Sequence, residues 1–425
     1  HTPINGELGS FYRPDGLLAN SKLKWETTIS RNFGIDFGFL NNRVNGSLEV
    51  YWNTTKDLLM AVPVDNTTGY SYQFQNFGKT SNRGIELSVN VDVINKGDFR
   101  FNVGAIYNYN RNKLDELPNA DQYLYSSYWG SSSLVPTNDY MFVEGKAIGL
   151  VRGFISEGYY TVDDFNYTNG QYVLKEGVPD ITKALTATYM HPYDLPAGQT
   201  AFPGAAKFRD VDESGTVDLD DATCLGEVMP RHTGSFQLNF NYKNFDLSTN
   251  FNWTAGGKVY NVAAMINASG QEFDGIGAQR ASWVADAFKV YNVNAAGDLY
   301  AVTNPDELRA LNANAKYHLP YHQSGITSSE WLENGSYLRL QTLTLGYTLP
   351  KNWLTKVHVD KIRLYLTATN LFTITGYSGI DPEVNANPTG QSGFYSDLRI
   401  FPTLNMDFGT YPRARTFTFG ANITF

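Results

Sequence analysis

The sequence predicts an all-β protein whose strands form a transmembrane antiparallel β-barrel. Long stretches alternate apolar and polar residues with a period of two, as strands with one apolar face do. The connections between these stretches alternate between tight turns and long excursions, a pattern typical of outer-membrane barrels. Aromatic residues make up 14% of the chain and glycine is abundant, which favours strands joined by turns.

The alternation defines about nine spanning strands, because spanning strands need about nine to eleven residues and soluble strands average about five or six. In the last stretch, for example, Phe417 and Phe419 alternate with Thr418 and Gly420. Within the seventh stretch the apolar phase shifts between Leu340 and Leu343, which predicts a β-bulge. The predicted strands lie near residues 25–40, 43–55, 81–95, 98–112, 233–243, 246–256, 335–350, 360–372 and 414–425.

The connections predict the topology of the barrel. Three tight turns lie near residues 40–42, 95–98 and 243–246, and a link of middle length covers 350–360. In outer-membrane barrels short turns face the periplasm and long loops face outward. We therefore expect the first strand to enter from outside and the ninth to end in the periplasm. The predicted long extracellular loops cover roughly 56–80, 113–232, 257–333 and 373–413.

Bulk features exclude other classes of protein. The 425 residues carry a formal net charge of −9 without a basic cluster, which argues against nucleic-acid binding. The sequence contains no apolar run of the roughly 18 residues that a transmembrane helix needs. The single cysteine, Cys224, excludes an intrachain disulfide framework.

Nine strands alone would leave two open edges. An unpaired strand edge in hydrocarbon is costly, because its backbone N–H and C=O groups have no partner there. We therefore expect residues 1–425 to be the C-terminal part of a larger barrel, whose earlier strands precede His1.

Seven segments, distributed over nearly the whole chain, carry a family resemblance. They include "NFGKTSNRGIEL" (76–87), "LTATNLFTITGYSGIDPEV" (366–384) and "YPRARTFTFGANITF" (411–425), and the others cover 23–59, 208–236, 245–261 and 334–350. In order and spacing they resemble the C-terminal half of the barrel of the SusC/RagA-type TonB-dependent transporters of Gram-negative outer membranes.

The resemblance implies a barrel of about 22 strands plugged by an N-terminal domain. It also implies a TonB-contacting segment before the plug and a SusD-like surface lipoprotein that caps the extracellular mouth. The plug and the TonB segment are not visible in this sequence. The implied function is active, TonB-dependent import of a nutrient, an oligosaccharide or an oligopeptide, across the outer membrane. Phe425 resembles the terminal signal of barrel assembly, and its alternative role is only to face lipid.

An acidic stretch, "RDVDESGTVDLDD" (209–221), has the spacing of a calcium-binding EF-hand loop. No amphipathic helix is predicted before it, which argues against a calcium sensor. We expect a structural Ca²⁺ site in an extracellular loop; the alternative is a solvated acidic turn in which Gly215 provides a positive φ. The residues at ligand positions of the pattern are Asp210, Asp212, Ser214, Thr216, Asp218 and Asp221, the last one carbon shorter than the usual Glu.

Two groups of aromatic residues fall in predicted extracellular loops. Exposed aromatic faces stack on sugar rings and also bury peptide side chains. The first group is therefore the candidate substrate-binding set: Tyr123, Tyr125, Tyr128 and Trp129. The alternative is that these rings pack the loop or contact the lipoprotein. The same alternatives apply to Tyr317, Tyr321 and Trp331.

Sequence patterns of catalytic sites are missing from the chain. It contains no G-x-S-x-G, P-loop or H-E-x-x-H pattern. His318 and His322 are close in sequence, but Pro320 between them disrupts a helix and argues against a zinc pair. We expect an importer without enzymatic activity, and the alternative is a passive porin or an outer-membrane barrel enzyme.

Overall fold

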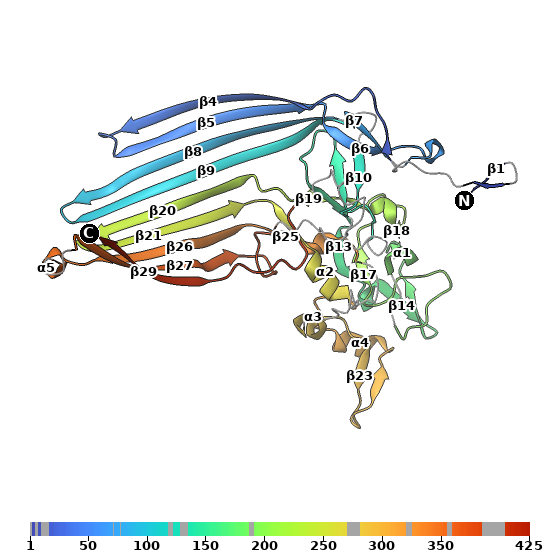
Figure 1. Cartoon of the computed structure of the whole chain (residues 1–425). Helices are drawn as coiled ribbons and strands as arrows, with labels where there is room; N and C mark the ends of the chain where they lie inside the picture. Colours follow the sequence, from blue (N-terminus) through green and yellow to red (C-terminus); the bar gives the residue numbers. More distant parts are fainter. Residues whose placement is uncertain are drawn as a thin grey trace.

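The structure is a computed structural model that describes residues 2–4, 7–9, 17–70, 72–76, 78–117, 122–127, 135–186, 191–269, 281–319, 325–354, 359–384 and 404–425. Its main element is an antiparallel sheet of nine long strands (Figure 1). In spatial order these are β29 (Thr416–Thr424), β27 (Lys361–Thr375), β26 (Tyr337–Thr348), β21 (Phe245–Ala255), β20 (His232–Tyr242), β9 (Phe99–Glu116), β8 (Lys79–Lys96), β5 (Val44–Lys56) and β4 (Thr27–Phe39). All nine predicted strands are confirmed.

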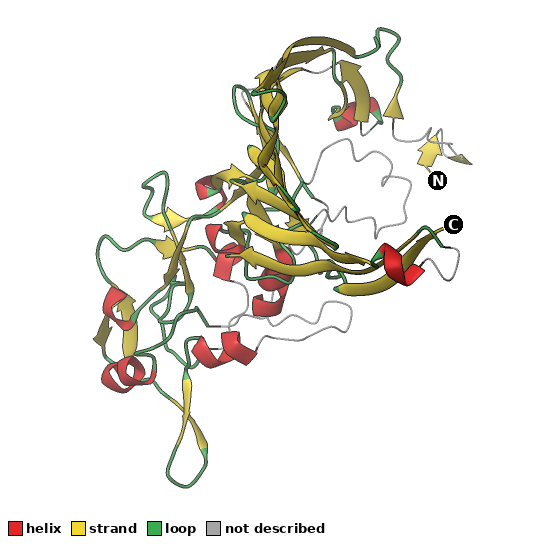
Figure 2. Cartoon of the chain, turned by 90° about the vertical axis from the view of Figure 1, so that its left-hand side faces the viewer, coloured by secondary structure: helices red, strands yellow, loops and turns green. Residues whose placement is uncertain are grey.

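Neighbouring strands of this sheet follow one another along the chain, so the sheet is a meander. The tight turns gather at one end of the strands, together with the C-terminus and α5 (Lys351–Leu354), which links β26 to β27 (Figure 1). The long excursions gather at the opposite end, as the sequence predicted. Figure 2, viewed along the strands, shows the sheet curving as an open arc between its edge strands β29 and β4.

The two faces of the sheet differ in chemistry. On one face, apolar side chains stay exposed: Phe33 by 61%, Phe417 by 62% and Phe419 by 73%. The strand register keeps such residues together across the sheet, for example Phe240 opposite Phe101 and Leu366 opposite Phe419. The other face carries polar side chains from the alternate positions of every strand. We call these the apolar face and the polar face.

The predicted bulge in the seventh strand is confirmed. The register of β26 shifts between Leu340 and Thr342 against β27, and its partner β21 shifts at the same place. Gln341 is therefore the extra residue, and Leu340 and Leu343 both stay on the apolar face. Opposite the bulge, Asn370 of β27 adopts a left-handed backbone conformation with φ of 51°.

The long excursions form a folded layer beyond one end of the sheet, here called the loop layer. Between β9 and β20 it contains β10 (Gln122–Tyr125), β11 (Tyr140–Val143), β12 (Leu150–Gly153), β13 (Ser156–Tyr159), η3 (Val162–Asp164), β14 (Phe165–Thr168), β15 (Gln171–Leu174), β16 (Asp180–Ile181), α1 (Lys183–Thr186), β17 (Ala206–Phe208), β18 (Thr216–Val217), η4 (Leu219–Asp221) and β19 (Thr223–Glu227). Between β21 and β26 it contains β22 (Lys258–Asn261), α2 (Val262–Ser269), α3 (Ala281–Asp286), β23 (Tyr291–Val293), β24 (Leu299–Ala301), α4 (Pro305–Leu311), η5 (Ser329–Trp331) and β25 (Leu332–Asn334).

Shorter elements complete the chain. They are β1 (Thr2–Ile4), β2 (Glu7–Gly9), β3 (Leu17–Leu18), β6 (Leu59–Pro63), η1 (Asn66–Thr68), β7 (Tyr72–Asn76) and β28 (Met406–Asp407). Among the described helices, none has the length and apolar character needed to span a bilayer.

The loop layer has its own hydrophobic core. One cluster joins the two largest excursions, with Phe154 and Phe202 from the first and Leu308 and Ile326 from the second. A second cluster adds the last excursion, because Met406 packs there with Tyr140 and Tyr260. The three excursions therefore fold as one unit. Figure 2 shows this unit extending beyond the arc of the sheet on its convex side.

Candidate functional site

The polar face of the sheet forms one side of the candidate conduit. Its charged groups come from alternate positions of several strands, so the sheet register brings distant residues together. Arg363 of β27 donates to Asp246 of β21 from Nε at 2.9 Å and from Nη2 at 2.5 Å. Near the other edge, Asn32 of β4 donates to Glu49 of β5 at 3.0 Å. This face offers charges and amides along the strands.

The acidic loop lies in the loop layer between β17 and β19. Residues 200–208 before it form no helix and end in β17, so the prediction that no amphipathic helix lies directly before the loop is confirmed. The loop folds around its own carboxylates: Ser214 N and Gly215 N donate to the two oxygens of Asp210 at 3.1 and 2.7 Å. Gly215 has a φ of 87°, which supports the predicted glycine turn.

Three carboxylates meet at the centre of this loop. Oxygens of Asp210, Asp212 and Asp221 all lie within 4.8 Å of one another. Asp221 is 1% exposed and accepts the backbone N–H of Val211 at 2.5 Å and that of Asp218 at 2.8 Å. The hydrogen bonds from Ser214 lower the pKa of Asp212, so this carboxylate stays ionised at neutral pH.

The donor set fits a hard cation in part. Carboxylate, hydroxyl and carbonyl oxygens are the ligands that Ca²⁺ takes. The Ser214 hydroxyl and the Thr216 carbonyl lie 3.0 Å apart, close enough to share an ion. Asp221 would have to share its oxygens between the ion and three backbone N–H groups, those of Val211, Asp212 and Asp218.

Two of the four aromatic residues predicted to bind substrate, Tyr123 and Tyr125, lie within the described part of the chain. Tyr125 is only 4% exposed, and its ring lies 5.5 Å from that of Tyr140 and 4.8 Å from that of Phe142. Tyr123 is half-buried and packs against the same core. Tyr128 and Trp129 lie outside the described residues. The two described rings thus match the alternative of loop packing, and the substrate-binding role of this group stays a prediction.

The second aromatic group also contributes to packing. Tyr317 stacks on Trp283 with ring centroids 4.7 Å apart, and Trp331 is 5% exposed. Tyr321 and His322 lie outside the described residues. His318 lies in the same region and is buried, and its Nδ1 donates to the carbonyl of Leu319 at 2.9 Å.

Two titratable groups, one buried and one partly buried, lie together near these rings. His318 Nε2 lies 4.0 Å from a carboxylate oxygen of Glu330 in η5. Burial raises the pKa of Glu330 to about 7 and lowers the pKa of His318 to about 4. Both shifts favour the uncharged forms, so this pair is not a fixed ion pair at neutral pH.

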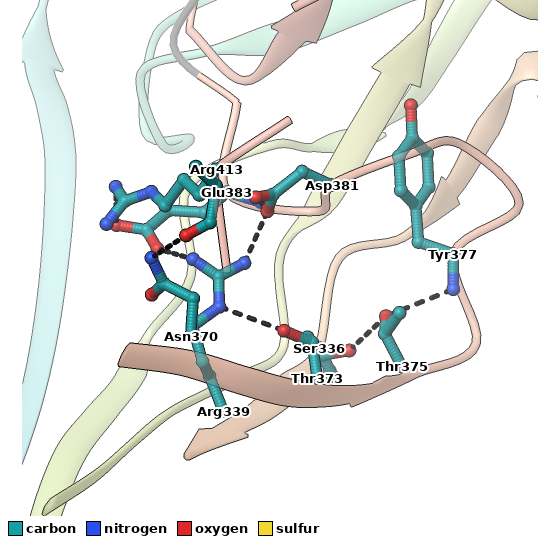
Figure 3. A network of polar contacts seen from close by, with 10 residues as sticks. Ser336, Arg339, Asn370, Thr373, Thr375, Tyr377, Asp381, Glu383 and Arg413 are labelled. Atoms are coloured by element: carbon teal, nitrogen blue, oxygen red, sulfur yellow. Dashed lines mark hydrogen bonds and ion pairs between the residues drawn. The ribbon is translucent and has the colours of Figure 1, made fainter. Parts of the chain in front are cut away.

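One charged network was not predicted from the sequence. Arg339, on the polar face of β26 and 2% exposed, donates to Asp381 at 2.5 Å, to Glu383 at 2.7 Å and to the Thr373 hydroxyl at 3.0 Å (Figure 3). Arg413 reaches the other oxygen of Glu383 at 2.6 Å. The network ties the segment after β27 and the segment before β29 to the sheet. Its only sequence signal is an arginine between Leu338 and Leu340, at a polar position of an alternating strand.

Comparison with known proteins places this geometry in a family. Residues 2–371 match the family described as "TonB dependent receptor-like, beta-barrel". The chain is 30% identical over 409 residues to TonB-dependent receptor P3 of Formosa agariphila, covering 96% of this chain and 35% of that protein. It is 27% identical to TonB-dependent receptor SusC of Bacteroides thetaiotaomicron, covering 100% of this chain and 34% of SusC. It thus spans about a third of the length of these relatives.

Solved structures support the fold. The RagAB peptide transporter superposes with a TM-score of 0.63 at 22% identity, over 96% of this chain and 36% of that one. The RagAB peptide importer in its "open-open" state gives 0.61 at 23% identity, over 96% of this chain and 35% of that one. At this identity the likeness concerns the fold, which is the antiparallel β-barrel fold predicted from the alternation. The chain therefore belongs to the TonB-dependent receptors, within the β-barrel of that family.

Proposed function

We propose that this chain forms the C-terminal barrel portion of an importer in the outer membrane of a Gram-negative cell. The observation that carries the proposal is the pair of opposed faces on the nine-stranded sheet. The apolar face suits hydrocarbon, and the polar face suits a hydrated conduit. The family match over residues 2–371 supports coupling to TonB.

In this proposal the parts of the chain have separate tasks. The polar face lines the passage, and the loop layer presents a folded surface on the extracellular side. A SusD-like surface lipoprotein would close over that surface and hold the ligand. The plug and the TonB-contacting segment would come from the part of the receptor that precedes these strands. Phe425, 85% exposed at the end of the chain, would serve barrel assembly.

The substrate proposed is a nutrient too large for diffusion through porins, either an oligosaccharide or an oligopeptide. The RagAB peptide transporter among the similar structures supports the oligopeptide, and the resemblance to the SusC/RagA type keeps the oligosaccharide as the other class. Tyr123, Tyr128 and Trp129 are proposed as substrate contacts. Tyr125 would then act by packing the core of the loop layer, because its own ring is buried.

Uptake in living cells tests the proposal. Cells expressing the whole receptor should accumulate a labelled oligosaccharide or oligopeptide, and deletion of TonB should abolish this uptake. A surface lipoprotein should co-purify with the receptor. Uptake that persists without TonB would identify a passive porin, and hydrolysis by the purified receptor alone would identify an enzyme.

We also propose a structural Ca²⁺ in the acidic loop, held by Asp210, Asp212 and Ser214, with Thr216, Asp218 and Asp221 completing the site. Added Ca²⁺ should then protect residues 209–221 from proteolysis, and Asp212→Asn should remove the protection. Asp298→Asn, in the β23–β24 turn of the loop layer, is the control. If Mg²⁺, or buffer without any divalent ion, protected residues 209–221 from proteolysis as well as Ca²⁺ does, the Ca²⁺ site would be excluded.

A further inference from the structure

A pocket lies where two strands of the sheet separate. β27 continues to Thr375, but its ladder with β29 ends at the pair Thr369 and Thr416. The chain at 412–415 instead runs beside the end of β27, held by one hydrogen bond of 3.1 Å from Asn370 to the carbonyl of Ala414. The opening is a pocket of about 310 Å³.

Arginines dominate the charge of this pocket. Arg339, Arg413 and Arg415 line it together with Asp381. Asp381 and Glu383 pair with Arg339 and Arg413, so Arg415 brings the unpaired charge. Arg339 is held by three partners. Arg413 is bound to Glu383, and 45% of its side chain stays exposed. Arg415 is exposed, and it takes part in none of the ion pairs among the described residues. A guanidinium with open donors in a pocket is a ready partner for a phosphate group.

Exposed apolar side chains border the same pocket. Phe372 and Ile380 line it and are exposed by 40% and 71%. Phe372 belongs to the apolar face, because it pairs with Leu340 and its ring lies 6.4 Å from that of Phe251. Ile374 and Phe417, exposed by 61% and 62%, extend this apolar surface on either side. The pocket therefore joins the end of the apolar face to the exposed guanidinium of Arg415 and the half-exposed one of Arg413.

We propose that this pocket binds the anionic headgroup of a membrane lipid. Arg415 and the free donors of Arg413 take the phosphate, and the acyl chains lie along Phe372 and Phe417. An amphiphile has this combination of one anionic group and adjacent hydrocarbon, and a guanidinium pairs with phosphate oxygens through two parallel hydrogen bonds. The inference rests on the membrane location of the proposed function, but it does not depend on transport.

Lipid retention by the purified receptor tests the inference. The receptor in mild detergent is titrated with phosphatidylglycerol or with phosphatidylcholine of the same acyl chains, and bound lipid is counted by native mass spectrometry. The wild type should prefer phosphatidylglycerol. Arg415→Gln should weaken this preference at least about tenfold, as expected for loss of charge-assisted hydrogen bonds.

Arg31→Gln is the matched control, because Arg31 is also exposed on the apolar face, opposite Trp52, but does not line this pocket. Competition by inorganic phosphate that disappears in Arg415→Gln would support recognition of the phosphate group. An equal loss in both variants, or wild-type retention by Arg415→Gln, would overturn the proposal. Binding of inorganic phosphate without preference for the anionic lipid would assign the pocket to a soluble anion instead. If the purified receptor stayed in solution without detergent, that result would contradict the proposed membrane location itself.

Discussion

Phenylalanine side chains occupy opposite environments in the two regions of this protein. On the sheet, Phe417 and Phe419 are 62% and 73% exposed. In the loop layer, Phe154 is fully buried and Phe202 is 1% exposed. The same residue type therefore faces outward in one region and inward in the other.

The difference indicates that the sheet and the loop layer are surrounded by different media. Apolar side chains leave water wherever a protein core can enclose them, which explains the loop layer. Exposed apolar surface as extensive as that of the sheet is not stable in water and needs a hydrocarbon environment or a partner. The loop layer is therefore organised like a water-soluble domain, and the sheet like a membrane protein.

The largest effect is expected from a cavity in the loop layer. Phe154→Ala should lower the free energy of unfolding of this layer by about 3–5 kcal/mol, because a large buried side chain leaves a cavity. Hydrogen exchange of residues 135–186 in the folded receptor measures this loss. Phe419→Ala is the matched control and should leave exchange in the loop layer unchanged. Similar effects of both variants would contradict the separation of the two regions.

The next effect concerns the link between the two regions. Arg339→Gln removes the partner of a nearly buried carboxylate, that of Asp381, and should destabilise the segment 376–384 by about 3 kcal/mol. Arg413→Gln breaks only the half-exposed pair with Glu383 and should cost about 1 kcal/mol or less. Hydrogen exchange of 376–384 compares the two variants, and equal costs would show that Arg339 is not the centre of the network.

The sheet was predictable from the sequence because its signal is local and repeated. Each strand alternates along its own length, so neither its existence nor its apolar face depends on distant contacts. Even the bulge at Gln341 could be predicted, because the apolar positions of the alternation shift by one residue between Leu340 and Leu343. The tight turns were predictable for the same reason: where two alternating stretches end and begin only a few residues apart, the residues between them must form the turn.

The loop layer and the site were less predictable because their contacts are distant in sequence. Phe154 N donates to Thr327 O at 2.9 Å, across two excursions separated by two strands. Arg339 meets Asp381 and Glu383, which lie in an irregular segment without periodicity. The burial of Tyr125 depends on Tyr140 and Phe142, which the alternation in 122–133 does not reveal. The acidic loop was recognised because its spacing is itself local.

A charge on the apolar face should have an intermediate effect. Phe419→Arg should lower the stability of the membrane-inserted protein by about 2 kcal/mol, because hydrocarbon disfavours a cation. Thr418→Arg places the same charge on the polar face and should cost much less. Urea-induced unfolding in lipid vesicles measures both variants. Equal costs would mean that the apolar face does not contact hydrocarbon.

The smallest effect is a dependence on pH within the loop layer. Because burial raises the pKa of Glu330 to about 7, from an ordinary value of 4.5, its contribution to stability is complete below pH 4.5 and is lost as the pH rises through 7. His318 acts in the opposite direction: burial lowers its pKa to about 4, from an ordinary 6.5, so its contribution is complete above pH 6.5 and is lost as the pH falls through 4.

Replacing Glu330 separates these two contributions. Glu330→Gln cannot ionise, so it should stabilise the loop layer at pH 8 by about 1 kcal/mol, less than the full linkage value because the carboxylate is partly hydrated. At pH 4 the variant and the wild type should agree, and the loss caused by His318 at low pH should persist in both. Thermal unfolding from pH 4 to 8 measures this, with Glu176→Gln, at an exposed position of the loop layer, as the control. A Glu330→Gln variant that follows the wild type at every pH would show that the carboxylate of Glu330 is ionised in the folded protein at neutral pH, which would place solvent, and therefore an opening, beside Trp331.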